Sequence, residues 1–349
     1  ISSYYDSSLV DGMAGSVNTP PNKDIRWEKT TTVNVGVDFA LFRHRLSGTI
    51  EYYNKYSVDL LAAINGSPTQ GFGYTTLMTN NGKMVNRGVE ITLSGEIIRQ
   101  KDFSWNASLL YAFNRNKVKH ISVQPSLWDS RISMPTSYPM VGKPLYGIYA
   151  YKWAGLNENG DPQVYDAENN VTSGPARDYH ALVYCGTTVP IHNASLTNVL
   201  RYKGFEFSAM LILDAGHKLR SSNIPSINMS NGRITSTAKG IVDRWTQPGD
   251  VTDVPRLLFS NDTENFNTHR TELYRYSDLF VYDASNIRLS NISLAYRVPA
   301  HWCKKISLSG ARLQFNVENV ATFAFDSKAN YDLGGKVKPN YVWGLYLNF

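Results

Sequence analysis

Residues 340–349 read NYVWGLYLNF, in which large apolar side chains alternate with smaller or more polar ones. The apolar phase consists of Tyr341, Trp343, Leu345, Leu347 and Phe349. Strict alternation of this kind predicts a β-strand with one apolar face. At the water-exposed edge of a sheet, such a strand would invite aggregation. The pattern is typical instead of a strand whose apolar face meets lipid in a transmembrane barrel.

The same alternation recurs along the chain, in runs of about the 9 to 11 residues that a tilted strand needs to cross a bilayer. The regular runs lie at 32–39, 46–53, 88–97, 103–114, 205–214 and 311–318. Two further runs, 191–202 and 286–299, are less regular, and a β-bulge near Asn291 would bring the two apolar phases of the second onto one face. Together with the terminal segment, these runs predict nine antiparallel strands.

The connections between these runs alternate in length. Short links are expected at 40–45, 98–102, 202–204 and 299–306, and long loops at about 56–86, 119–190, 215–283 and 320–339. Short periplasmic turns and long extracellular loops are typical of outer-membrane barrels. For the strands to alternate in direction, the segment 145–165 must form a hairpin outside the membrane, turned at NENG. Single-chain barrels have even strand numbers, so an odd number predicts that residues 1–349 are a portion of one larger barrel domain.

Composition agrees with an all-β membrane protein. Hydrophobic residues make up 42% of the chain and the mean hydropathy is −0.32, with no apolar run long enough for a transmembrane helix. Aromatic residues reach 12%, which suits the interfacial girdles of a barrel. The net charge of +6 is scattered along the chain without a basic cluster, so nucleic-acid binding is not expected. The first residues do not form a signal peptide, which also favours a fragment.

No motif of a hydrolase, a metalloprotease or a redox dithiol is present, and the seven histidines lie far apart, so we expect no enzyme activity. Two acidic tracts, NENGDP at 157–162 and YDAENN at 165–170, lack the EF-hand spacing. We interpret them as hairpin turns; calcium bound outside that motif is the alternative. No cofactor and no metal site are predicted. The two cysteines, Cys185 and Cys303, should lie on opposite sides of the membrane without a disulfide.

Charged residues fall on the polar phase of the predicted strands, where a water-filled lumen would accept them. They are Asp38, Glu51, Glu90, Glu96, Glu206, Asp214, Arg312 and Glu318. They would pair with one another, stay hydrated, line a solute path or contact a domain inside the barrel.

Several ordered stretches resemble blocks of the SusC-like (SusC/RagA) TonB-dependent transporters. They are DIRWEKTTTVNVGVDFALFRHRLSGTIEYYNKYSVDLL (24–61), NNGKMVNRGVEITLSGEII (80–98), RWTQPGDVTDVPRL (244–257), NIRLSNISLAYRVP (286–299) and the terminal NYVWGLYLNF. The resemblance covers 24–349 and implies a multi-pass outer-membrane barrel of about 22 strands with a plugged lumen. This chain would supply roughly the last nine strands, without the plug and the first barrel strands.

The resemblance also implies the function and the partners. It implies active import of an oligosaccharide or peptide through the bacterial outer membrane, energised by TonB through the absent N-terminal region, with a SusD-like surface lipoprotein as partner. A passive porin-like or adhesin barrel is the alternative, and a secreted carbohydrate-binding β-sandwich is a third. By the same resemblance, the alternating terminal residues ending in Phe349 are the signal that the outer-membrane assembly machinery reads.

Aromatic residues in the predicted loops are the candidates for contact with substrate or partner. They are Tyr74, Trp128, Tyr138, Tyr149, Tyr151, Trp153, Tyr179, Trp245 and Tyr274. Aromatic rings stack on sugar rings and are favoured in protein interfaces. Three roles stay open for them: packing of the loops, docking of the lipoprotein and direct contact with substrate. For the 244–257 block, the Pro248-Gly249 pair favours a loop-shaping role.

Overall fold

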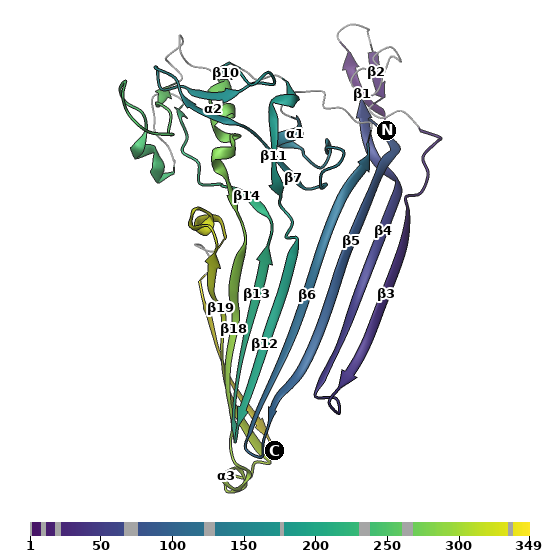
Figure 1. Ribbon diagram of the computed structural model, residues 1–349, viewed down its shortest axis with the longest axis vertical. Coiled ribbons are helices and arrows are strands. Elements are labelled where there is room, and N and C mark those ends of the chain that lie inside the picture. Colours follow the sequence, from purple (N-terminus) through teal and green to yellow (C-terminus); the bar gives the residue numbers. More distant parts are fainter. Residues whose placement is uncertain are drawn as a thin grey trace.

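The computed structural model describes residues 2–7, 12–17, 22–65, 76–121, 130–174, 178–229, 238–259, 268–333 and 338–349. Within these ranges, nine strands form one antiparallel sheet in the order β20-β19-β18-β13-β12-β6-β5-β4-β3, so strands that adjoin in the sheet follow one another along the chain (Figure 1). They are β3 (Lys29–Leu41), β4 (Leu46–Asn65), β5 (Thr76–Arg99), β6 (Phe103–His120), β12 (His192–Tyr202), β13 (Phe205–Ala215), β18 (Asn286–Arg297), β19 (Gly310–Ala324) and β20 (Asn340–Asn348). All the predicted strands are confirmed, as is the all-β, antiparallel fold class.

The strand register separates the side chains into two faces. One row across the sheet is apolar, formed by Leu93, Leu109, Leu196, Leu211 and Leu289. A row of the opposite face is mostly polar, formed by Glu51, Glu90, Ala112, Asn193 and Asp214. Within the described ranges no protein layer covers the apolar face, and Val37, Trp343 and Leu345 on it are 62%, 77% and 61% exposed. A β-sandwich would bury this face, so the structure excludes the sandwich alternative.

A β-bulge in β18 explains the irregular pattern of that strand. Against β13, Leu289 and Asn291 pair with the adjacent residues Leu211 and Met210, so Ser290 is the extra residue of β18. The register against β19 also shifts between Leu289 and Asn291. The shift places Ile287 and Ile292 on the same apolar face, although their spacing alone would put them on opposite faces. The bulge predicted near Asn291 is confirmed.

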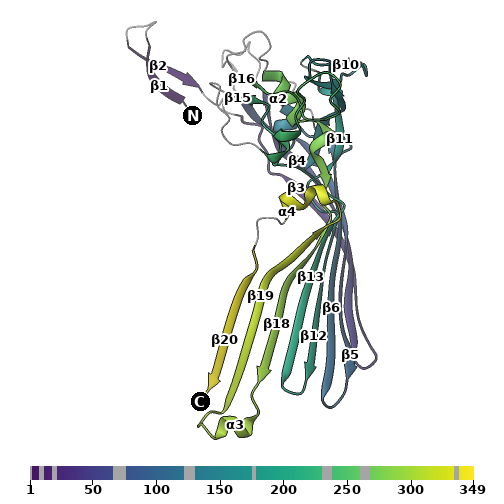
Figure 2. The same cartoon turned by 90° about the vertical axis from the view of Figure 1, so that its left-hand side faces the viewer.

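The two ends of the sheet differ. One end carries short turns, together with the helix α3 (Ala300–Lys304) and the chain end Phe349, while the long connections gather at the other end (Figure 2). We call these the turn end and the loop end. Cys303 lies in α3 and Cys185 lies in β11 (Leu182–Thr187) at the loop end, and both are free thiols, as predicted. In the part of the chain that the structure describes, no helix is long and apolar enough to cross a membrane.

The loop end contains small sheets and short helices. Antiparallel pairing joins β7 (Gly147–Tyr151) to β11, β8 (Trp153–Leu156) to β9 (Pro162–Tyr165), β9 to β10 (Val171–Thr172), β14 (Lys218–Arg220) to β17 (Val281–Asp283) and β1 (Ser2–Ser7) to β2 (Gly12–Val17), whereas β15 (Asn228–Met229) and β16 (Leu258–Phe259) are parallel. The helices are α1 (Ser130–Ser133), η2 (Tyr179–Ala181), η3 (Lys239–Asp243), α2 (Thr268–Arg275), η4 (Asp278–Phe280), η5 (Ser327–Ala329) and α4 (Asn330–Leu333). The segment 145–165 lies outside the large sheet and contains the β8–β9 hairpin, as predicted.

The expected loop over 56–86 differs from the structure. Strand β4 continues to Asn65 and β5 begins at Thr76, so only 66–75 of that range lies outside the described residues. The register shifts between Ser57 and Leu61, and these irregularities break the alternation that would have revealed the strand. The hairpin therefore extends the sheet at its loop end.

Candidate functional site

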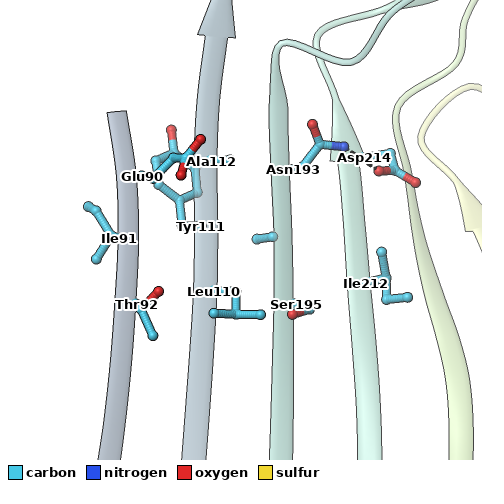
Figure 3. A pocket seen from close by; sticks show the side chains of 11 residues that line it. Glu90, Ile91, Thr92, Leu110, Tyr111, Ala112, Asn193, Ser195, Ile212 and Asp214 are labelled. Carbon is cyan, nitrogen blue, oxygen red and sulfur yellow. Dashed lines mark hydrogen bonds between the residues drawn. The ribbon is translucent and has the colours of Figure 1, made fainter. Parts of the chain in front are cut away.

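A shallow hollow of about 300 Å³ lies on the polar face, toward the loop end (Figure 3). Residues from β5, β6, β12 and β13 line it: Glu90, Ile91, Thr92, Leu110, Tyr111, Ala112, Asn193, Ala194, Ser195, Ile212 and Asp214. Asn193 Nδ2 donates a hydrogen bond to Asp214 Oδ1 at 2.7 Å, and Arg288 pairs with the other carboxylate oxygen at 2.9 Å. The hollow therefore combines carboxylates and amides with small apolar surfaces.

The polar face changes charge along its length. Near the hollow, Glu51 and Glu90 are direct register partners, so two carboxylates lie side by side. Toward the turn end, Glu206 accepts hydrogen bonds from Arg201 at 2.7 Å and from Arg312 at 3.1 Å. The cations outnumber the acids there, because Lys203 and Arg297 border the same hollow as Glu206 and the two arginines. A solute moving along this face would meet an acidic region and then a basic one.

The sequence predicted that certain charged residues lie on the polar phase of the strands. The register shows that all of them lie on this one face. Several of them are paired: Asp38 accepts from the Thr49 hydroxyl at 2.6 Å, and Glu318 accepts from the Asn340 amide at 3.3 Å. A glycine shapes the same surface, since a Cβ at Gly88 would lie 2.4 Å from the ring of Tyr53. Only glycine lets this ring lie against the neighbouring strand. Pairing, which one of the interpretations expected, is therefore present on this face: Glu206 pairs with Arg312, and Asp214 with Arg288.

The loop end is held together by a network of ion pairs around Asp161, which we call the Asp161 network. Asp161 Oδ1 accepts from Arg270 Nε at 2.7 Å, and its carboxylate also receives two hydrogen bonds from Arg256, at 3.1 and 2.7 Å. The Arg270 side chain is only 5% exposed, and its guanidinium further donates to the Asn228 side chain and to the Arg256 carbonyl. The network ties the turn between β8 and β9 to α2 and to the 244–257 block.

The 244–257 block docks on that same turn. Gly160 has a φ of +74°, and a Cβ there would meet the indole ring of Trp245 at 2.4 Å, so glycine is required both for the turn and for the packing. The Arg256 amide donates to the Gly160 carbonyl at 3.0 Å. These contacts support the loop-shaping role proposed for this block.

The loop aromatics fall into two groups by burial. Tyr149, Tyr151 and Tyr274 are 1%, 0% and 1% exposed and form the cores beneath the loops. Their burial supports the packing role, because they present almost no surface to a ligand. Burial also raises the pKa of the Tyr274 hydroxyl, with a contribution from Asp253, so it stays protonated.

Tyr138, Trp153 and Trp245 are only partly buried and keep some surface for contact. Trp153 is fixed at both ends: its amide donates to Asp278 and its indole Nε1 donates to Asp253, each at 2.9 Å. Tyr74 and Trp128 lie outside the described residues, as does the side chain of Tyr179. The contact hypothesis for the loop aromatics remains a prediction.

Sequence reasoning did not single out Arg220, a partly buried cation. Its guanidinium donates to the carbonyls of Tyr149, Arg275 and Ser277 at 2.7, 3.2 and 3.2 Å. Burial lowers the pKa of Arg220. It joins β7 to the segment after α2, and no spacing in the sequence signals a partner so distant.

The acidic tracts form turns in the structure. In the first, Asn157 Oδ1 accepts from the amides of Asn159 and Asp161, and in the second Asp166 accepts from the Asn170 amide. Among the described residues, no group of three or more His, Cys, Asp or Glu side chains is placed to hold a metal ion. Burial and the nearby Asp278 raise the pKa of the Cys185 thiol to about 11, which makes it a poor nucleophile.

Three features occur together in outer-membrane β-barrel proteins: an exposed apolar face, a polar opposite face, and short turns at one end of the sheet with long loops at the other. The chain has all three, and they define its class. A family model described as "TonB dependent receptor-like, beta-barrel" matches residues 1–320. The chain belongs to that family, and its predicted SusC-like character and outer-membrane localisation are confirmed.

Curated relatives agree. The chain is 25% identical to TonB-dependent receptor P3 of Formosa agariphila, over 93% of this chain and 33% of that protein. It is also 25% identical to TonB-dependent receptor SusC of Bacteroides thetaiotaomicron, over 85% of this chain and 29% of that protein. The chain therefore spans about a third of the length of these relatives.

A solved structure has the same fold. The RagAB peptide transporter structure superposes with a TM-score of 0.76 at 22% identity, covering all of this chain and 38% of the matched chain. At this identity the match establishes the fold alone.

Proposed function

We propose that the protein containing this chain is an active nutrient importer of the outer membrane that takes up oligosaccharides or peptides. The observation that carries the proposal is the two-faced sheet, with an exposed apolar face and a charged, hollowed polar face that leads away from the loop cluster. A barrel closed from such a sheet provides a hydrated interior for polar solutes. Membership of the TonB-dependent receptor family supports energy coupling. We place contact with TonB in a region outside this chain.

A SusD-like surface lipoprotein is the proposed partner at the loop end. Apolar side chains are exposed there: Tyr146, Val171, Val242 and Val251 are 46%, 49%, 67% and 103% exposed. A lipoprotein that covers these loops would remove such side chains from water. Affinity purification of the tagged full-length protein from outer membranes should recover a lipoprotein in stoichiometric amount.

Uptake by whole cells tests the proposal. We expect cells that express the full-length protein to accumulate fluorescent oligosaccharides or peptides, and expect accumulation to stop when either this gene or tonB is deleted. Uptake that persists without TonB would contradict the proposal and favour the passive porin-like alternative. If deletion of this gene abolishes attachment of the cells to a surface but leaves uptake unchanged, the adhesin alternative is favoured.

A further inference from the structure

A second hollow lies at the loop end of the polar face, between the extended β4–β5 hairpin and the segment 134–145. Its volume is about 430 Å³, within the range of small-ligand sites. The lining residues are Glu28, Leu60, Leu61, Ala62, Met78, Gly82, Lys83, Met84, Val118, His120, Ile121, Thr136, Ser137, Pro139 and Leu145. We call this hollow the mouth pocket.

The mouth pocket belongs to the polar face by register. Met84 pairs with Val118, and these residues lie an even number of positions from the pair Glu90 and Ala112, which borders the hollow of Figure 3. Side chains separated by an even number of positions along a strand point to the same side. A solute that enters between the loops and follows the polar face would therefore meet the mouth pocket first.

The chemistry of the lining does not suit a sugar. Most of the lining side chains are aliphatic or thioether groups, and none of the described residues that line the pocket is Phe, Tyr or Trp. A sugar ring carries several hydroxyl groups, and each of them loses free energy when it is buried without a hydrogen-bond partner. The lining that the structure describes also presents no flat aromatic surface of the kind on which sugar rings stack. An aliphatic or aromatic side chain of a ligand has the apolar surface that this lining can bury.

One cation borders the apolar lining. Lys83 lines the pocket at the point where the register of β5 against β6 shifts, between Lys83 and Met84, so the simple alternation of faces does not apply to it. It is exposed, and within the described ranges its ammonium group forms no ion pair and no hydrogen bond. The lining carboxylate, Glu28, accepts a hydrogen bond from the Leu61 amide at 2.8 Å and, in the described structure, forms no ion pair with Lys83. An unpaired ammonium beside an apolar pocket is complementary to a ligand that carries a carboxylate close to an apolar group.

We infer that the mouth pocket binds peptides, taking an apolar side chain among Leu60, Met84, Val118 and Leu145 while Lys83 pairs with a peptide carboxylate. This inference rests on the proposed import function and narrows its substrate class to peptides. The backbone amides of a peptide can stay in the solvent of the open mouth while one side chain is buried. The pocket thereby selects for an apolar residue near a carboxylate.

Direct binding to the purified full-length protein tests the inference. The probes are fluorescein-labelled octapeptides with Leu or Ser at the residue before the C-terminus, each with a free or an amidated C-terminus, and labelled maltoheptaose. The variant Ser137→Trp fills the pocket from an exposed position on its lining, and Val141→Trp places the same ring at an exposed position of the same segment outside the lining. Heat-modifiable migration in gels verifies that both variants are folded.

We expect the Leu peptide to bind at least about tenfold more tightly than the Ser peptide, because the free energy gained by burying one aliphatic side chain is large enough for that difference in affinity. Ser137→Trp should remove this preference and Val141→Trp should keep it. Lys83→Gln should weaken binding of the free-acid peptide by about three- to tenfold and leave the amidated peptide unchanged.

Tight binding of maltoheptaose that Ser137→Trp abolishes would overturn the inference. Equal behaviour of the two Trp variants, or failure of every octapeptide to bind, would also overturn it. The proposed function has a separate readout, because TonB-dependent uptake of an oligosaccharide would sustain import while refuting the peptide assignment. Loss of TonB dependence would refute import itself.

Discussion

Replacement of Asp161 by Asn tests how the loop cluster is held together. The carboxylate of Asp161 neutralises Arg270, which is almost completely buried, and also binds Arg256. Asparagine has nearly the same size but carries no charge, and only its carbonyl oxygen can accept. The change leaves the packing in place, so any loss of stability reports on the ion pairs.

The expected size of the effect follows from burial. Removing one partner of a buried ion pair costs about 3–5 kcal/mol. Asp161 and Arg256 are 19% and 23% exposed, so water screens part of this interaction and we expect about 2–3 kcal/mol. A difference of this size corresponds to about a 30- to 150-fold change in a local opening equilibrium. The strands of the large sheet should be unaffected, because the network lies outside them.

Hydrogen–deuterium exchange of the folded protein in detergent measures that opening. The amides of Asn157 and Arg256 are the reporters, since they donate to the Asp161 and Gly160 carbonyls at 2.9 and 3.0 Å. The matched control is Asp166→Asn in the next hairpin turn, where the carboxylate accepts only from Asn170 in the described structure. Equal protection of the reporter amides in the two variants would refute the stabilising role of the Asp161 network.

Three further changes have defined outcomes. Leu196→Arg should destabilise the barrel by about 2–4 kcal/mol in urea titrations in lipid vesicles, because the new charge enters lipid, whereas Thr197→Arg on the polar face should cost much less; equal costs would contradict the face assignment. Phe349→Ala, or an appended charged tail, should reduce the fraction of folded protein in the outer membrane more than the ligand binding of the fraction that inserts; normal insertion of both variants would remove the assembly role. Burial lowers the pKa of His217 below its ordinary 6.5, so the unfolded loops take up a proton first and their stability should fall as the pH drops below about 6.5. Proteolysis of the loops at pH 5 and 7.5 should show this dependence in the native protein and less of it in His217→Gln; identical profiles would contradict it.

The sequence predicted the strands because lipid and water impose opposite demands on neighbouring residues. In β4 and β5, the apolar Ile50 and Ile91 pair across the strands, and the polar positions beside them pair in the same way, Glu51 with Glu90 and Thr49 with Thr92. Such a constraint is local and can be read two residues at a time. In the part of β4 after Ser57 the alternation of apolar and polar residues ends. Sequence reasoning therefore expected a loop there, although the hydrogen-bonded ladder continues.

The contacts within the loop cluster could not be predicted from the sequence in the same way. Arg256 and Arg270 lie 95 and 109 residues from Asp161 along the chain, and no periodicity relates them. The burial of Tyr149 and Tyr274 likewise depends on how separate loops fold over one another. Their side chains alone fit a binding surface as well as a core, and only the assembled structure distinguishes the two.

The central claim is that one face of the nine-stranded sheet lies in lipid and the other in a hydrated interior. Nitroxide spin labels placed one at a time at 194–199, after replacement of Cys185 and Cys303 by serine, test it most directly in lipid vesicles. We predict that collision with oxygen, which concentrates in lipid, is high at positions 194, 196 and 198, and that collision with a water-soluble nickel chelate is high at 195, 197 and 199. Accessibility without this alternation, or with the opposite phase, would contradict the claim.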